Sequence, residues 1–98
     1  MSYKKQFAIS LRKTRNSLYL DQKSFAEEMD ISLSTLKNWE LCISLPTQKN
    51  FSDLIDNLGS FGADMEDIRE LNEVYVKAKT KYIMEGPTEK EAKKFEVM

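Results

Sequence analysis

The sequence has no histidine, a single cysteine (Cys42), three glycines and two prolines among its 98 residues. A zinc site with nitrogen and sulfur ligands is therefore excluded, the commonest general base is missing, and Cys42 has no partner for an internal disulfide. No glycine-rich phosphate loop occurs either, and neighbouring carboxylates such as Glu27 and Glu28 point apart on a helix. We therefore expect no metal, no cofactor and no catalytic activity.

Long hydrophobic runs are also missing. No segment approaches the ~20 consecutive apolar residues of a membrane span, and no basic-then-apolar leader precedes Phe7. The lone cysteine fits a reducing compartment. We expect a cytoplasmic protein without a membrane partner, in which 98 residues of 41% apolar composition form one compact domain with an appendage.

The chain as a whole lacks a strong charge of either sign, since its formal net charge is −1. Its halves differ, however. Residues 1–50 carry eight Lys or Arg against five Asp or Glu, which gives +3, whereas residues 51–98 carry seven against eleven, which gives −4. A basic half followed by an acidic half suits a small nucleic-acid-binding head on a solvated segment that binds partners.

The most informative stretch runs from Gln22 to Glu40 and reads as two short helices joined by a tight turn. Phe25 and Met29 have helical spacing and mark one buried face. Asp30 stands where the first helix must end, and aspartate tolerates a left-handed backbone. Ser32 is a good N-cap for the second helix.

In that second helix, Leu36 and Trp39 share one face and are expected in the core. The opposite face carries small, amide and cationic groups: Leu33, Ser34, Lys37 and Asn38. A short helix of this kind can lie in the major groove of DNA, where Asn38 can pair with adenine and Lys37 can reach guanine or a phosphate. Leu33 has two interpretations, contact with a thymine methyl group or an incidental surface leucine.

Residues spread along the stretch 7–61 form an ordered set with characteristic spacings. They are Leu11-Arg12 and Arg15 in a first helix, Gln22, Phe25-Ala26 and Ile31-Ser32 in the second helix and turn, Leu36, Trp39-Glu40 and Pro46 in and after the third helix, and Leu54, Leu58 and Gly59 in a fourth. Together they resemble the Cro/CI-type (lambda-repressor-like, XRE) helix-turn-helix regulators. The resemblance implies an all-α bundle of four to five helices that binds DNA and regulates transcription.

The resemblance also implies roles for individual residues. It pairs Arg15 with Glu40 at the end of the recognition helix; the alternative is an unrelated surface arginine. It has Gln22, which follows the N-cap Asp21, contact the DNA backbone and buttress the recognition helix. Lys49 can reach a phosphate or be an ordinary surface residue. The expected DNA-binding set is Gln22, Lys23, Ser32, Leu33, Ser34, Lys37, Asn38 and Lys49.

Three positions depart from the family, which usually has glycine where this chain has Tyr19, Asp30 and Cys42. A left-handed cysteine is strained, unlike a left-handed aspartate. We therefore expect the loop from Leu41 to Leu45 to follow a different path, which leaves open whether this loop contacts a phosphate.

Two helices are expected after Pro46. Thr47 caps a fourth helix that Gly59 ends, and a longer helix runs from its cap Asp64 to Glu85, before Gly86-Pro87. The longer helix carries apolar side chains at spacings of three and four, the pattern of a coiled-coil seam: Ile68, Leu71, Tyr75, Ala78 and Tyr82. We expect this stripe to join two copies; the alternative is that it packs on its own head.

The expected organisation is a helix-turn-helix DNA-binding domain over residues 1–62, a dimerisation helix over 63–86 and a charged, flexible tail over 87–98. The expected function is sequence-specific binding of double-stranded DNA as a homodimeric repressor of a bacterial, phage or mobile-element promoter. An alternative of another class is an antitoxin-like or anti-repressor regulator that binds a protein partner through its acidic C-terminal half. The operator, the target genes, any inducer and the choice between repressor and activator stay open.

Overall fold

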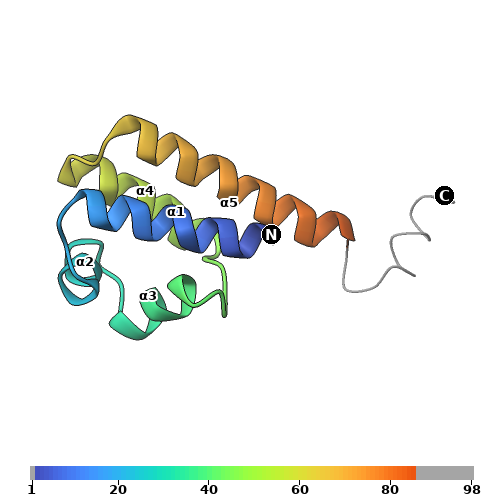
Figure 1. The fold of residues 1–98 in the computed structure, drawn as a ribbon, viewed down its shortest axis with the longest axis horizontal. Coiled ribbons are helices and arrows are strands. Elements are labelled where there is room, and N and C mark those ends of the chain that lie inside the picture. The colour runs from blue at the N-terminus through green and yellow to red at the C-terminus, as the bar shows by residue number, and fades with distance from the viewer. Residues whose placement is uncertain (1, 86–98) are drawn as a thin grey trace, which may run out of the picture.

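Five α-helices make up the part of the chain that this computed structural model describes, residues 2–85, with side chains described for residues 2–80. They are α1 (Tyr3–Ser17), α2 (Gln22–Glu28), α3 (Leu33–Glu40), α4 (Gln48–Phe61) and α5 (Met65–Glu85), and no strand occurs among these residues. α5 runs antiparallel along α1, while α2 and α3 lie on the other side of α1 (Figure 1). The predicted all-α bundle with a longer C-terminal helix is confirmed.

The helix starts follow the local sequence. The predicted caps Asp21, Ser32 and Thr47 each accept a hydrogen bond from the backbone N–H three residues further on, at 2.7, 3.1 and 3.1 Å. Asp64 accepts one from the Glu66 N–H at 2.8 Å, just ahead of α5. These bonds satisfy N–H groups that have no partner within the helix, and so they fix where each helix begins.

Left-handed backbone conformations occur at Tyr19, Asp30 and Cys42, with φ of 59°, 57° and 64°. These are the three places where glycine is usual in the family. The prediction that the loop after α3 departs from this path is therefore wrong at Cys42, which adopts the left-handed conformation. The next residue shows why it can: the Ile43 N–H donates to the Asn38 carbonyl at 2.9 Å, which closes the end of α3 over the strained residue.

The end of α4 corrects another prediction. α4 continues through Gly59 and ends at Gly62, which has φ of 100° and donates its N–H to the carbonyls of Leu58 and Gly59. A left-handed residue at this position is the usual helix stop, and glycine adopts it without a steric cost. Gly59 has an ordinary helical place, so the prediction that it ends the helix is wrong.

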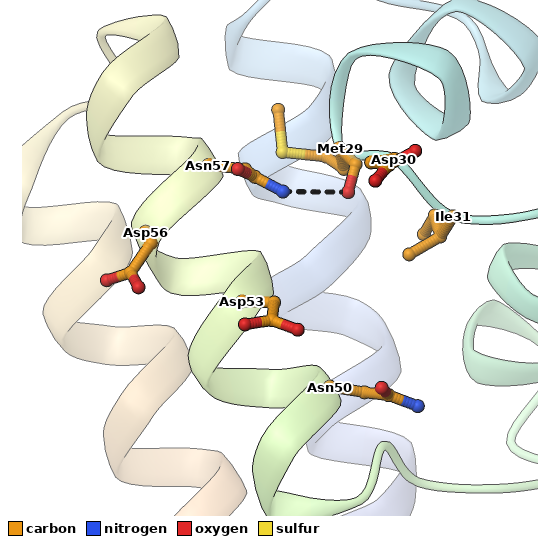
Figure 2. A pocket seen from close by; sticks show the side chains of 7 residues that line it. All are labelled: Met29, Asp30, Ile31, Asn50, Asp53, Asp56 and Asn57. Carbon is orange, nitrogen blue, oxygen red and sulfur yellow. Dashed lines mark hydrogen bonds between the residues drawn. The ribbon is translucent and has the colours of Figure 1, made fainter.

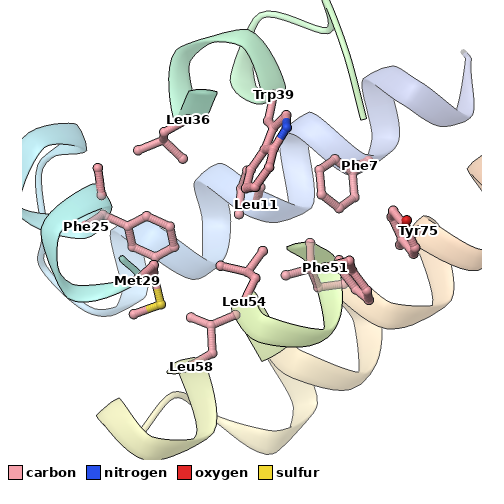
Figure 3. Packing of buried hydrophobic residues seen from close by; sticks show 12 residues of the cluster. Phe7, Leu11, Phe25, Met29, Leu36, Trp39, Phe51, Leu54, Leu58 and Tyr75 are labelled. Carbon is pink, nitrogen blue, oxygen red and sulfur yellow. The ribbon is translucent and has the colours of Figure 1, made fainter. Parts of the chain in front are cut away.

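One apolar core joins the five helices. At one end, the rings of Phe51 and Tyr75 stack with centroids 3.8 Å apart, and Phe7 meets them at 6.2 and 5.8 Å (Figure 3). Leu36 and Trp39 enter the same core from α3, with exposed fractions of 0% and 3%. Because these two side chains are enclosed, the inner face of α3 is fixed against the bundle.

The apolar stripe of α5 is buried within its own chain. Leu71, Tyr75 and Ala78 are 0%, 4% and 5% exposed, and Ile68 packs against the same core. The Tyr75 hydroxyl also donates to the Pro46 carbonyl at 2.8 Å. The prediction of a seam between two copies is therefore wrong for Leu71, Tyr75 and Ala78, whose apolar surface already packs within the bundle, whereas Ile68 is half-buried and keeps part of its surface exposed.

Other predictions for the C-terminal region fall beyond the described part. The side chain of Tyr82, the remaining residue of the predicted seam, and the predicted charged tail over residues 87–98 lie outside the described residues. Within the described part, α5 shares one core with the helices that precede it.

Candidate nucleic-acid interface

α3 has one buried and one exposed face. Leu36 and Trp39 are buried, whereas Leu33 is half-buried and three polar residues are exposed: Ser34, Lys37 and Asn38. Within the described part of the chain, no hydrogen bond or ion pair engages these three polar side chains. The exposed face of α3 therefore presents a hydroxyl, an ammonium and an amide that are available to a ligand.

Ser32 lies at the start of this face but is less available. Its hydroxyl donates to Thr35 Oγ1 at 2.7 Å and accepts from the Thr35 N–H at 3.1 Å. A serine hydroxyl has one hydrogen to donate. A phosphate contact by Ser32 therefore requires its hydroxyl to turn away from Thr35.

A buried carboxylate holds the C-terminal end of α3. Glu40 is 2% exposed and accepts two hydrogen bonds from the Arg15 guanidinium, at 2.8 and 3.1 Å, so the predicted pair is present. The Gln22 amide donates to the same carboxylate at 3.1 Å. A bidentate charged pair fixes orientation as well as distance, and this one ties α3 to α1, while Gln22 adds a link to α2.

Arg12 adds a contact to this end of α3 that the sequence does not reveal. Its guanidinium donates to the Glu40 backbone carbonyl, and its Nε lies 3.8 Å from Glu40 Oε1. The last carbonyls of a helix lack partners within the helix, and a cation beside them opposes the negative end of the helix dipole. The Arg12 side chain is 48% exposed, and its sequence context does not distinguish it from a solvated arginine.

The residues predicted to contact phosphates differ in availability. Lys23 is exposed. Lys49 is exposed too but pairs with Asp53, one turn further along α4, at 3.3 Å. Such an exposed pair contributes little to stability, so Lys49 can leave it for a phosphate. Gln22 uses one amide hydrogen on Glu40, and its second is left to donate.

The other side of the turn between α2 and α3 is acidic. A pocket of about 270 Å³ lies between this turn and α4, and three aspartates, Asp30, Asp53 and Asp56, are among the residues that line it (Figure 2). The Asn57 amide donates to the Met29 carbonyl at 2.9 Å, which holds the end of α2 on α4. Carboxylates repel phosphates, so we expect DNA to approach the turn from the side that carries the exposed face of α3.

Other kinds of site find no support in the described residues. They contain no group of three or more His, Cys, Asp or Glu that could hold a metal ion. No helix in that part of the chain is long and apolar enough to cross a membrane.

A comparison with protein families gives a match over half of the chain. A family model described as a helix-turn-helix matches residues 11–60, from the middle of α1 into the last turn of α4. The matched span contains the Arg15–Glu40 pair and the whole of α3. Comparisons with curated proteins and with solved structures find no match.

Proposed function

The chain belongs to the Cro/CI-type helix-turn-helix family of DNA-binding regulators, and we propose that it recognises a specific sequence of double-stranded DNA and acts as a homodimeric repressor of a bacterial, phage or mobile-element promoter. Family membership supplies the DNA-binding, regulatory role. The base-reading residues, the pairing of two copies and the repression of a promoter are the proposal.

The proposal rests chiefly on the exposed face of α3. The major groove, ~12 Å wide, admits an α-helix whose outer side chains reach the base edges. Asn38 can bond bidentately to adenine, Ser34 lies one turn before it, and Lys37 can reach guanine or a phosphate. Leu33, at the start of the helix, supplies an apolar contact to a thymine methyl group.

The buried contacts around Glu40 position this face. Arg15 and Gln22 hold the Glu40 carboxylate, and Arg12 holds its backbone carbonyl. α3 therefore keeps a fixed angle to α1 and α2 before it meets DNA. Side chains on a preorganised element lose little freedom on binding, so contacts to base edges give specificity at a smaller cost.

Contacts to phosphates then set the register on the duplex without reading the sequence. Lys23, Lys49 and the free amide hydrogen of Gln22 are the donors proposed for this role. The N-terminal half of the chain carries only a modest positive charge. We therefore expect one copy to bind weakly and binding to fall as the salt concentration rises.

The test begins with selection of bound duplexes from a random-sequence library. Asn38→Ala should then weaken binding to the selected duplex by ~1–3 kcal/mol and relax specificity at one base pair. Asn16→Ala is the matched control, since Asn16 is an exposed asparagine on α1 and is not among the proposed DNA-binding residues; it should bind like the wild type. An equal loss by Asn38→Ala on selected and unrelated duplexes would contradict the base-reading role.

Repression is tested separately with a reporter gene that carries the selected sequence across its promoter. Expression should fall when the wild-type chain is present and recover with Asn38→Ala. A rise in expression would show an activator instead.

One observation favours the second candidate function, an antitoxin-like or anti-repressor regulator that binds a protein partner. α5 exposes acidic side chains along its N-terminal half, among them Glu66, Glu70 and Glu73, and among the described residues only Lys13 and Arg69 form ion pairs with this group. A basic partner would complement this surface. Stable co-purification of such a partner, with no selection of any duplex, would favour this candidate over the DNA reader.

A further inference from the structure

A homodimer needs an exposed surface, and three residues of the stripe predicted for that role are buried. Leu71, Tyr75 and Ala78 are enclosed by their own chain. A symmetric DNA reader that spans two half-sites places the same surface patch of each copy against the other. Within the described part of the chain, such a patch must therefore lie away from these three residues.

A groove between α4 and α5 offers an apolar surface of this kind. Its volume is about 500 Å³, and Ile55 of α4 and Met65 and Ile68 of α5 form its apolar lining. The two isoleucines are half-buried and rest on the core, whereas Met65 is 77% exposed. A flexible, exposed methionine over a partly buried apolar floor adapts readily to a partner surface.

The rim of the groove points to a second copy as the occupant. Glu66 and Arg69 line it and form an ion pair at 2.7 Å, with both side chains largely exposed. A twofold interface places the patch of one chain against the same patch of the other chain. Arg69 of one chain can therefore pair with Glu66 of the other, while the apolar residues meet between these pairs. A patch with both charges and an apolar centre is complementary to itself. A partner with charge of a single sign would be repelled by either Glu66 or Arg69.

We propose that this α4–α5 groove is the surface through which two copies pair about a twofold axis. The inference rests on the proposed function, which requires two copies on DNA, and it names the surface that joins them. Six residues line the groove, far fewer than the ~20–30 residues that each partner contributes to a standard stable interface. The dimer is therefore weak in solution and forms chiefly when two copies occupy neighbouring half-sites.

The test compares Met65→Arg with Val76→Arg. Both residues are exposed on α5, and Val76 does not line the groove. Met65→Arg places a cation on the apolar surface next to Arg69. On a duplex with two selected half-sites, Met65→Arg should lose about 100-fold in affinity, the order of gain that linking two binding events provides. On a duplex with one half-site it should bind like the wild type, and Val76→Arg should match the wild type on both.

Sedimentation of the free proteins at high concentration tests the surface without DNA. The wild type and Val76→Arg should show a concentration-dependent dimer that Met65→Arg lacks. Dimerisation of Met65→Arg like the wild type, or its loss in Val76→Arg instead, would overturn the assignment of the groove. Failure of the wild type to bind any duplex, with the Met65-dependent dimer intact, would contradict the proposed function and leave the groove supported.

Discussion

The Glu40 carboxylate should be among the most sensitive polar groups in the fold. Glu40→Ala removes the partner of Arg15, whose side chain is only 14% exposed. Removal of one member of a buried pair typically costs ~3–5 kcal/mol, because it leaves an uncompensated buried charge. Arg15 keeps one other acceptor, the Leu20 carbonyl at 3.1 Å. We therefore expect the lower end of that range, a loss of ~3 kcal/mol in the free energy of unfolding.

A loss of this size is easy to measure. For a domain of this length, each kcal/mol lowers the melting temperature by ~4–8 °C, so Glu40→Ala should melt ~12–24 °C below the wild type. Arg12→Met is the matched control, since Arg12 is half-exposed and bonds to the Glu40 backbone, which remains; it should cost less than ~1 kcal/mol. Urea denaturation followed by circular dichroism gives the free energies.

A double-mutant cycle tests whether the loss comes from the pair itself. Arg15→Met alone should also be strongly destabilising, since it removes both hydrogen bonds that the buried carboxylate accepts from Arg15 and leaves only the half-exposed Arg12, with Nε 3.8 Å away, as a cation. Together the two changes should cost much less than the sum of the single losses. A Glu40→Ala loss below ~1 kcal/mol, or single losses that add within ~0.5 kcal/mol, would refute the reasoning.

Three further predictions concern other parts of the bundle. Gly62→Ala should lower the free energy of unfolding by ~1–2 kcal/mol, since φ is 100° there. Gly59→Ala, in the interior of α4, should instead raise the free energy of unfolding by ~0.5–1 kcal/mol. Changes of the same sign for both variants in urea denaturation would contradict this account. Tyr75→Phe should cost ~1–3 kcal/mol because it leaves the buried Pro46 carbonyl without its hydrogen bond, and an unchanged melting temperature would disprove that contribution. A backbone N–H bond lowers the pKa of Asp21 below its ordinary value of 3.8. The stabilisation of the fold by this cap is therefore complete above that pH and is lost as the pH falls through the folded-state pKa. Asp21→Asn should flatten this acid-side loss in urea denaturation at several pH values, and an unchanged pH profile would argue against the cap.

Much of the fold is encoded locally and could be predicted from the sequence. Asp21, Ser32 and Thr47 mark helix starts because each needs only a side-chain oxygen and an N–H three residues on. The apolar spacing of Leu36 and Trp39 likewise defines the buried face of α3 and, by exclusion, its exposed face.

The errors arise where local sequence leaves two solutions. Gly59 and Gly62 are both able to end α4, and only the chain that follows decides which one becomes left-handed. The stripe of α5 has the same spacing whether it meets a second copy or its own head. The position of this stripe depends on Phe7 and Phe51, which lie far away in the sequence and meet Tyr75 only in the folded chain.

The site shows a similar division. The pairing of Arg15 with Glu40 followed from resemblance to a family, because nothing local to either residue indicates burial. Arg12 and its bond to the end of α3 could not be anticipated, since the contact spans residues 28 positions apart. The left-handed conformation of Cys42 also depends on hydrogen bonds made after α3 ends, which outweigh the local strain.

The most direct test of the central claim, that the exposed face of α3 reads bases, is a specificity profile. The affinities of the wild type and Asn38→Ala are measured for the selected duplex and for duplexes that change it one base pair at a time. We predict that the wild type discriminates at several positions and that Asn38→Ala loses discrimination at one of them, with the rest of the profile unchanged. A profile that keeps its shape in Asn38→Ala, lowered equally for every duplex, would contradict the claim.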